Sequence, residues 1–368
     1  MLEEKFTEQK TQKKHAAEFV VNIVKRGRWN CLPLRQSRSN MSNLVVGVAC
    51  HGYSSEATIS MQSAKTVMAN LQKQYSSLFY LKITSNKWFV VDSEGHELEI
   101  PVGQFTFEYK GQRLRFDVLF NALHGSPGED GKLAALLELA SIPHTSCDMY
   151  PAALTFNKRD CIAIARRLGV PTAPSITLDK GDRIDLDEIQ TGVGFPCFVK
   201  ANRAGSSFGV FKVAHKEELQ TCIHKAFEED SQLIIEQALE GREVSVGVLR
   251  LQDQIKVLPI TEIITENGFF DYAAKYEGQC QEITPAGIPK EWEESVSHWA
   301  HLLYDKLDLK GITRSEFIFV DGVPHLLEIN TVPGMTQASI IPQQAQAAGI
   351  KLDELFSELL KTALKRNT

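Results

Sequence analysis

Apolar residues in the first part of the chain recur at the spacings of alternating strands and helices. The run LVVGVAC at 44–50 ends in a glycine turn, and the segment 58–73 that follows has apolar residues at helical spacing. Further strands are predicted at SLFYLKI, WFVVD and FDVLFNAL, and the last of them leads through the loop HGSPGEDG into a helix. We therefore expect residues 41–150 to form an open α/β domain, in which ligands bind at the carboxyl ends of the strands.

A change of pattern after a predicted helix over 152–168 indicates a new unit. Short strands separated by glycine-containing loops define a central unit over 151–240. An antiparallel strand pair, a long helix, a hairpin over 312–330 and a terminal helix follow. Helices beside an antiparallel sheet are typical of an α+β unit, which we expect over 241–368.

Composition narrows the classes of function. The 368 residues are 43% hydrophobic and 23% charged, with a net charge of −6, which is typical of a globular protein and favours neither nucleic acid nor a membrane surface as a partner. Seven cysteines without a CxxC pair argue against a disulfide framework and a zinc site, so we expect a cytoplasmic protein. No apolar run approaches the roughly 20 residues of a membrane span.

Residues 1–40 differ from the rest of the chain. They hold nine Lys and Arg against four Glu, and their polar stretches QKTQKK and RQSRSN have no periodic apolar face. They also lack an apolar run of signal-peptide length. We expect these residues to be an N-terminal extension outside the folded core.

A lysine and a flexible loop follow the predicted strand PCFVK. The segment KANRAGSSFGV, from Lys200 to Val210, has glycines and serines whose N–H and hydroxyl groups can surround anionic oxygens. It lacks the GK[ST] ending of a Walker A loop, and the chain has no GxGxxG motif. A phosphate-binding loop is one interpretation, and a tight hairpin loop in which Gly205 and Gly209 supply positive φ is the other.

The predicted hairpin near the carboxyl end gathers charged and amide side chains. Arg314 and Glu316 are two residues apart on one strand, and Glu328 and Asn330 are two apart on the next, so each pair shares a face. Oxygen ligands of this kind suit Mg²⁺ or Mn²⁺ held jointly with phosphates, whereas zinc prefers His and Cys. The alternative is a solvated face with a surface ion pair, which the scarcity of other polar residues in FIFV and HLLEI disfavours.

The metal site sets the expected register of this hairpin. Directly opposed residues point to the same face, so we pair Glu316 with Glu328 and Arg314 with Asn330. This register predicts a three-residue loop over 321–323, although Asp-Gly between apolar runs usually signals a two-residue turn. A two-residue turn would pair Val320 with Val323 and place the two glutamates on opposite faces.

Several motifs, in the same order along the chain, carry a resemblance to a known family. They are HGYSSEATISMQS, HGSPGEDG, NKRD, VKANRAGSSFGV, IIEQALEGREVSVGVL, FFDYAAKY and LLEINTVPGMTQASIIP. Over residues 41–365 the chain resembles the D-alanine–D-alanine ligases of the ATP-grasp superfamily. The resemblance implies an N-terminal open α/β domain followed by a two-part ATP-grasp fold, with the nucleotide held between two sheets.

The resemblance implies a nucleotide site. The lysines expected to neutralise the phosphates of ATP are Lys158, Lys200 and Lys275. Glu236 and the backbone at Leu239 would bind adenine, and Glu243 would accept hydrogen bonds from the ribose. Taken singly, each lysine is more simply a solvated surface charge, and Glu243 a carboxylate at a sheet edge.

The resemblance also implies a site for the first D-alanine. Glu56 would hold its ammonium group, although a carboxylate at a helix start also has a structural use. Ser206 and Tyr276 would join Glu56 in a hydrogen-bonded bridge that closes the phosphate loop and the ω-loop over the site and excludes water. His124 would order the loop beside this substrate.

For the second D-alanine and the metal, the resemblance implies residues near the carboxyl end. Ser339, which precedes Ile340, would receive the substrate carboxylate. Arg314 and the backbone N–H of Gly334 would stabilise the tetrahedral oxyanion. Two Mg²⁺ or Mn²⁺ ions would be held by Glu316, Glu328 and Asn330, although the family more often has aspartate where this chain has Glu316.

The implied reaction is the ATP-dependent ligation of two D-alanine molecules through D-alanyl phosphate. It gives D-alanyl-D-alanine, ADP and phosphate for peptidoglycan precursor synthesis. The alternatives are a ligase that makes D-alanyl-D-lactate or D-alanyl-D-serine, another ATP-grasp carboxylate–amine ligase, and a non-catalytic nucleotide-binding module. Tyr276 argues against a D-lactate enzyme, because such relatives usually lack tyrosine there. The resemblance further implies a homodimer.

Overall fold

The computed structural model describes residues 41–205, 208–265 and 280–366. Its residues from Ser42 onward form one compact unit. Within these described ranges, no helix is long and apolar enough to cross a membrane. The sequence-based predictions that lie outside the described residues are those for 1–40, Ser206, Lys275 and Tyr276.

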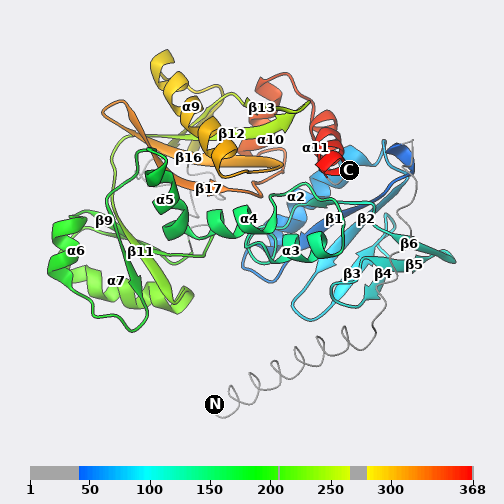
Figure 1. The fold of residues 1–368 in the computed structure, drawn as a ribbon, viewed down its shortest axis with the longest axis horizontal. Helices are drawn as coiled ribbons and strands as arrows, with labels where there is room; N and C mark the ends of the chain where they lie inside the picture. The colour runs from blue at the N-terminus through cyan, green and yellow to red at the C-terminus, as the bar shows by residue number, and fades with distance from the viewer. Residues whose placement is uncertain (1–40, 206–207, 266–279, 367–368) are drawn as a thin grey trace, which may run out of the picture. The chain divides into compact units, whose positions relative to one another are not determined.

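The first sheet has the strand order β4-β3-β2-β1-β7 (Figure 1). Its strands and the elements beside them are β1 (Val45–His51), α2 (Ala57–Leu71), β2 (Ser77–Ile83), β3 (Trp88–Val91), β4 (Glu97–Ile100), the hairpin of β5 (Thr106–Tyr109) and β6 (Gln112–Arg115), β7 (Val118–Asn121) and α3 (Lys132–Leu139). β1 pairs in parallel with β2 and β7, whereas β3 and β4 are antiparallel. Parallel pairing needs a crossover, which α2 supplies between β1 and β2. The carboxyl ends of β1 and β7 therefore lead into the two loops whose motifs were predicted to bind ligands.

The helix predicted over 152–168 is two helices in the structure. α4 (Met149–Phe156) and α5 (Lys158–Arg167) meet at Asn157, whose backbone is extended. The Asn157 side chain accepts a hydrogen bond from the N–H of Asp160 and so caps α5. The single-helix prediction was wrong because apolar periodicity does not reveal a cap within a helical stretch. The break places Lys158 in the first turn of α5.

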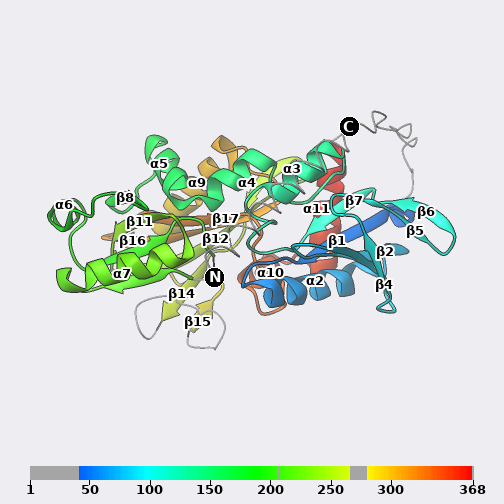
Figure 2. The same cartoon turned by 90° about the horizontal axis from the view of Figure 1, so that it is seen from below.

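The second sheet has the order β10-β9-β11-β8 and is covered on one face by two helices (Figure 2). Its elements are β8 (Ser175–Asp179), α6 (Leu186–Gly192), β9 (Cys197–Ala201), β10 (Val210–Val213), α7 (Lys216–Glu229) and β11 (Gln232–Gln237). Val199 and Leu233 pack with Leu219 of α7 in one apolar cluster. Because side chains alternate along a strand, Lys200 and Glu236 lie on the opposite face.

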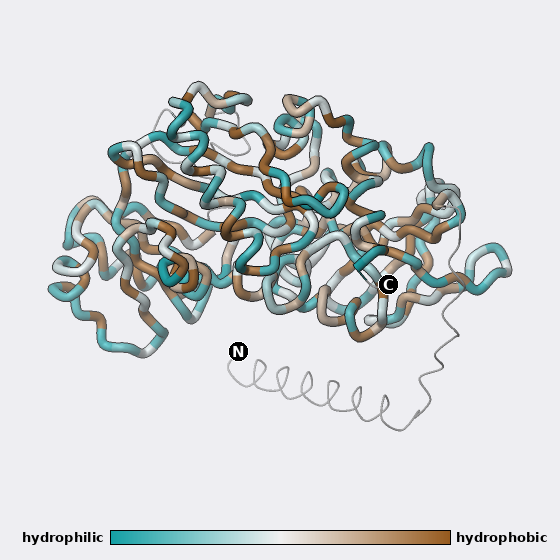
Figure 3. The backbone as a smooth tube through the Cα atoms, turned by 45° about the horizontal axis from the view of Figure 1, so that its top comes forward, coloured by the Kyte–Doolittle hydropathy of each residue, from teal (hydrophilic) through white to brown (hydrophobic). Residues whose placement is uncertain are grey.

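The third sheet has the order β15-β14-β12-β16-β17, with β13 paired to β12. Its elements are β12 (Arg242–Leu251), β13 (Gln254–Val257), β14 (Thr261–Thr265), β15 (Cys280–Ile283), α9 (Lys290–Lys306), β16 (Ile312–Val320), β17 (Val323–Asn330) and α10 (Ile340–Ala347). One face packs on α9 through residues such as Val244, Phe317 and Leu303. The alternation of apolar and polar positions appears as brown and teal segments in Figure 3. The polar positions of β12, β16 and β17 face away from α9.

The last helix, α11 (Leu352–Arg366), returns to the first sheet (Figure 1). The ring of Phe356 packs edge-on against that of Phe120 in β7, with centroids 5.4 Å apart. The hydroxyl oxygens of Tyr75 and Ser357 lie 3.3 Å apart. The two ends of the described chain therefore share one core.

The β16–β17 hairpin has the predicted pairing but not the predicted loop. Glu316 is the partner of Glu328, and Arg314 is the partner of Asn330. At the other end, Val320 pairs with Val323, so Asp321 and Gly322 alone form the turn. Both turn residues have positive φ, 50° and 81°, as a type I′ hairpin turn requires. The prediction of a three-residue loop was wrong, and the usual meaning of Asp-Gly holds.

A β-bulge explains how a two-residue turn still places both glutamates on one face. The register shifts between Glu316 and Phe317, and Leu327 is the extra residue on β17. Leu326 pairs with Phe317 on the face toward α9, whereas Glu328, two residues later, lies on the other face beside Glu316. On an unbroken strand these two residues would share a face. The bulge, and not a longer loop, positions the carboxylate.

Candidate active site

One cavity of about 300 Å³ gathers side chains from all parts of the described chain. The predicted site residues that line it are Glu56, His124, Lys158, Arg314, Glu328, Asn330, Gly334, Ser339 and Ile340. The predicted residues that are described but do not line it are Lys200, Glu236, Leu239, Glu243 and Glu316. The cavity therefore joins the positions expected for the two amino acids with part of the expected metal site.

Glu56 lies directly before α2 and is closely surrounded by backbone. Its side chain is buried, and the turn before it is held by the Ser54 hydroxyl, which donates to the carbonyl of His124. A Cβ atom added to Gly205 would lie 2.7 Å from Glu56 Oε2, and one added to Gly125 would lie 2.8 Å from it. These glycines let two loops reach the same carboxylate, one of which is the predicted phosphate loop.

Replacing Gly205 by alanine is expected to lower kcat/KM for the predicted first amino-acid substrate about 10- to 100-fold, because the loop or Glu56 must then move by a fraction of an ångström. Steady-state kinetics and thermal unfolding of the variant test this. Gly287→Ala is the matched control, since its added Cβ would meet nothing within 4 Å and its φ is not positive. Equal kinetics of the two variants would contradict the close approach of the loop to Glu56.

His124 is buried and makes two side-chain hydrogen bonds. Its Nδ1 lies 2.7 Å from the carbonyl oxygen of Val332, and its Nε2 lies 2.9 Å from Ser63 Oγ. Burial lowers the pKa of His124, although the carboxylate of Glu56 opposes this. Since a carbonyl only accepts, Nδ1 carries the proton, and the neutral ring accepts at Nε2 from Ser63.

The paired carboxylates of the hairpin have cations beside them. Arg314 Nε lies 2.7 Å from Glu316 Oε1, and Lys158 Nζ lies 3.4 Å from Glu328 Oε2. Asn330 lies on the same face, and its Oδ1 accepts from the N–H of Val332 at 3.0 Å. Two carboxylates and an amide oxygen on one face form an oxygen-only donor set, which fits Mg²⁺ or Mn²⁺ better than zinc.

The second sheet presents a lysine toward these carboxylates. Lys200 Nζ donates to Glu236 Oε2 at 2.6 Å, and the Glu236 side chain is buried whereas that of Lys200 is partly buried. Burial lowers the pKa of Lys200, but the charges of Glu236, Glu328 and Glu243 together outweigh this and raise it. Residues on two different sheets thus act on one another, as expected if a nucleotide binds between the sheets.

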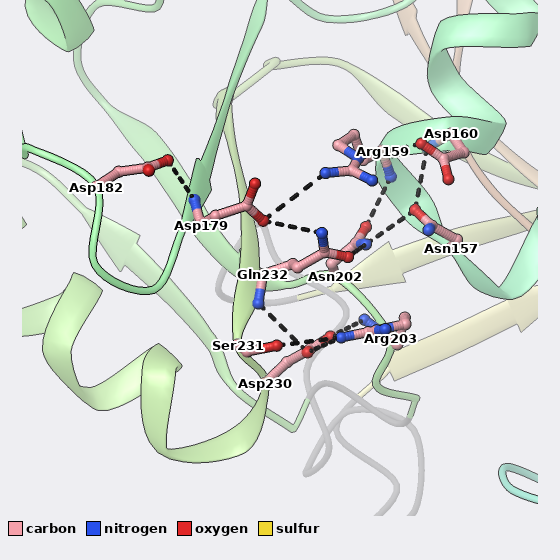
Figure 4. Close-up of polar contacts among 10 residues, drawn as sticks. All are labelled: Asn157, Arg159, Asp160, Asp179, Asp182, Asn202, Arg203, Asp230, Ser231 and Gln232. Carbon is pink, nitrogen blue, oxygen red and sulfur yellow. Dashed lines mark hydrogen bonds and ion pairs between the residues drawn. The ribbon is translucent and has the colours of Figure 1, made fainter.

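A polar network joins Asn157 and Arg159 to Asn202 at the start of the predicted phosphate loop (Figure 4). The side chain of Asn202, which is fully buried, accepts from the N–H of Arg159 and donates to Asn157 Oδ1, each at 2.8 Å. The carbonyl of Asn202 also accepts from the N–H of Lys158. Next to it, Arg203 forms a two-pronged ion pair with Asp230. The network therefore ties the start of α5 to the base of the loop.

The segment before α10 brings the predicted oxyanion and second-substrate groups together. Ser339 is the N-cap of α10, and its Oγ lies 2.7 Å from Thr336 Oγ1. A Cβ added to Gly334 would lie 2.7 Å from Ser339 Oγ, so the Gly334 backbone and the hydroxyl are neighbours. Ile340 is buried against Ile263 and is an apolar wall of the site.

Two carboxyl groups in the cavity had no predicted role. Burial raises the pKa of Glu129 to about 8, the carboxylate of Glu56 adds to the rise, and the N–H of Gly125 donates to Glu129 Oε2 at 2.7 Å. Burial also raises the pKa of Glu282, which accepts from Gln343 Nε2 at 2.7 Å. Glu129 could have been found as one of two adjacent acidic residues in the glycine-rich motif HGSPGEDG. No sequence signal distinguishes Glu282.

Comparisons with known proteins place these observations in a family. The profile described as D-ala D-ala ligase N-terminus matches residues 45–147, and the profile described as D-ala D-ala ligase C-terminus matches residues 164–361. The D-alanine–D-alanine ligase of Flavobacterium johnsoniae is 49% identical over 319 residues, which cover 87% of this chain and 99% of the relative. That of Christiangramia forsetii is 47% identical, covering 87% of this chain and 98% of the relative.

Solved structures agree with the sequence relatives. The D-alanyl-alanine synthetase A of Vibrio cholerae superposes with a TM-score of 0.79 at 26% identity, covering 88% of this chain and 99% of the other. The Bacillus anthracis D-alanine–D-alanine ligase complexed with ATP has a TM-score of 0.70 at 29% identity, with coverages of 88% and 98%. The VanG D-Ala:D-Ser ligase of Enterococcus faecalis has a TM-score of 0.74 at 29% identity, with coverages of 87% and 99%. The chain belongs to the D-alanine–D-alanine ligase family, and it is an enzyme with the ATP-grasp fold.

Proposed function

We propose that this protein joins two D-alanine molecules in an ATP-dependent reaction that passes through a D-alanyl phosphate. The observation that carries the proposal is the single cavity lined by Glu56, Lys158, Arg314, Gly334 and Ser339. One carboxylate suits an ammonium group, two cations suit phosphate and carboxylate groups, and a backbone N–H with a hydroxyl suits a second carboxylate. This set matches the charges of two amino acids and a phosphate.

Each group of the cavity has a role in this proposal. Glu56 holds the ammonium group of the first D-alanine, and His124 orders the loop beside it. Lys158 approaches the transferred phosphate, while Ser339 receives the carboxylate of the second D-alanine. Arg314 and the N–H of Gly334 donate to the oxyanion that forms when the second amine attacks. Exclusion of water by Ser206 and Tyr276 stays a prediction.

The nucleotide and the metal are assigned to the facing sheets. Lys200 contacts the phosphates, Glu236 and the backbone at Leu239 contact adenine, and Glu243 accepts from the ribose. The residues that would hold Mg²⁺ or Mn²⁺ are Glu316, Glu328 and Asn330, with Lys275 as a further cation near the phosphates. The metal would neutralise charge on the transferring phosphoryl group. We place the reaction in the cytoplasm, where ATP is supplied.

The relatives of this chain differ in the second substrate for which they are named. The D-alanine–D-alanine ligases at 49% and 47% identity favour D-alanine, whereas the VanG structure is named for D-serine. The test is a coupled assay of ADP release with D-alanine, D-serine, D-lactate and L-alanine in parallel. We expect D-alanine alone to stimulate release strongly. Stimulation that requires D-serine or D-lactate beside D-alanine would overturn the assignment, and no stimulation by any compound would indicate a nucleotide-binding module.

A further inference from the structure

A buried serine of α2 contacts the backbone segment that carries the proposed oxyanion donor. Ser63 lies in the middle of α2, is fully buried and does not line the cavity. Its Oγ lies 2.9 Å from His124 Nε2, and it accepts from the N–H of Met335 at 3.2 Å. Met335 lies 272 residues away in the chain, so this hydrogen bond depends entirely on the tertiary fold.

The hydrogen bonds form one chain with a defined direction. The Nδ1–H of His124 donates to the carbonyl of Val332, and the Ser63 hydroxyl donates to His124 Nε2. The remaining lone pairs of Ser63 Oγ accept from the N–H of Met335. Buried hydrogen bonds that share atoms in this way reinforce one another and hold a unique geometry.

The side chains of His124 and Ser63 bind a short backbone segment at both of its ends. His124 holds the carbonyl of Val332, which belongs to the peptide before Pro333, and Ser63 holds the N–H of Met335, which belongs to the peptide after Gly334. The peptide between Pro333 and Gly334 carries the N–H assigned to the oxyanion. Its orientation is therefore set by the two peptides on either side.

Of the backbone N–H groups of residues 332–335, that of Gly334 is the one available to a ligand. The N–H of Val332 donates to Asn330 Oδ1, Pro333 has no N–H, and that of Met335 is held by Ser63. Gly334 lines the cavity, and among the residues that the structure describes no acceptor is found for its N–H.

We propose that Ser63 is a positioning residue for the ligation step: with His124 it holds the backbone at Val332 and Met335 so that the Gly334 N–H can donate to the tetrahedral oxyanion. The inference rests on the proposed function for the identity of the reacting oxygen. Ser63 itself does not reach the substrates. Its loss should therefore weaken stabilisation of the transition state and leave ATP binding unchanged.

The test compares Ser63→Ala and Ser63→Cys with the wild type. We expect Ser63→Ala to lower kcat about 10- to 100-fold, since removing one oxyanion donor outright costs about 10²–10³-fold. KM for ATP should stay within about twofold, because the nucleotide residues are untouched. Ser63→Cys keeps a weak hydrogen-bonding group of similar size, so its kcat should lie between those of the wild type and Ser63→Ala. It also carries the test if the alanine variant does not fold.

A matched control separates positioning from ordinary loss of stability. Ser357→Ala also removes a buried hydroxyl from a helix, but its partner is Tyr75, outside the cavity. We expect it to lower the melting temperature without changing kcat. A Ser63→Ala enzyme with the kcat of Ser357→Ala, or with an equal loss of ATP affinity, would overturn the proposal.

Hydrogen exchange gives a readout that does not depend on turnover. Peptides that cover 331–336 should exchange faster in Ser63→Ala, because the N–H of Met335 loses its acceptor, and should be unchanged in Ser357→Ala. An unchanged exchange rate in Ser63→Ala would contradict the proposal that Ser63 holds this segment in place. A wild type without D-alanine-stimulated ADP release would instead contradict the proposed function, and the exchange result would still decide the positioning.

Discussion

Replacing Glu328 by glutamine is expected to lower kcat at least about 100-fold. Mutating a residue that only hydrogen-bonds to a metal ligand already costs about 10- to 100-fold, and Glu328 is proposed to bind the metal directly. Glutamine keeps the shape but not the charge that sits beside Glu316 in the register and 3.4 Å from Lys158. The measurement is D-alanine-stimulated ADP release across a Mg²⁺ titration. The half-saturating Mg²⁺ concentration should rise together with the loss of kcat.

The control for this variant is Glu97→Gln in β4. Glu97 pairs with Lys82 at 2.9 Å in a partly exposed salt bridge of the first sheet, outside the cavity. Exposed pairs contribute little, so we expect kinetics within about twofold of the wild type. An unchanged kcat and Mg²⁺ dependence in Glu328→Gln would remove Glu328 from the metal site.

Replacing Arg314 by lysine is expected to lower kcat about 100-fold, because the loss of one oxyanion donor has a cost of this size. The KM for ATP should change little. Lysine keeps the positive charge that lies against Glu316, so the carboxylate remains compensated. What is lost is the planar fork, which can hold Glu316 and donate to the reacting oxygen together. Steady-state kinetics in D-alanine and in ATP separate the two effects.

Arg250→Lys is the companion control on the neighbouring strand. Arg250 belongs to β12 and donates to the backbone carbonyl of Asp253, outside the cavity. Its replacement should leave both kcat and KM within about twofold of the wild type. A normal kcat for Arg314→Lys would show that charge alone suffices there and would contradict the proposed role of the fork.

Local sequence patterns predicted most elements of the fold. Apolar runs such as LVVGVAC and FDVLFNAL identified strands, because a parallel strand covered on both faces is apolar at nearly every position. The same patterns missed the break at Asn157 and the bulge at Leu327. Both features depend on one residue whose hydrogen bonds or pairing replace the regular ones, and periodicity averages over such residues.

The candidate site, too, was predicted from the sequence only in part. The pairing of Glu316 with Glu328 followed from the requirement that two ligands share a face, and the register confirms it. The loop prediction failed because it assumed a regular ladder between turn and site. The places of Glu129 and Glu282 in the cavity depend on burial by distant segments, which local sequence does not report.

By itself, the sequence determined which residues are available for chemistry and which local faces they occupy. Strand alternation puts Arg314 and Glu316 on one face, and Glu328 and Asn330 are related in the same way, because the geometry of an extended strand alone sets these relations. Only the tertiary structure decided that Ser63 meets Met335 and that Gly205 meets Glu56. Such contacts form when separate apolar faces are buried together. The relative positions of the packed helices and strands then depend on every side chain in the core.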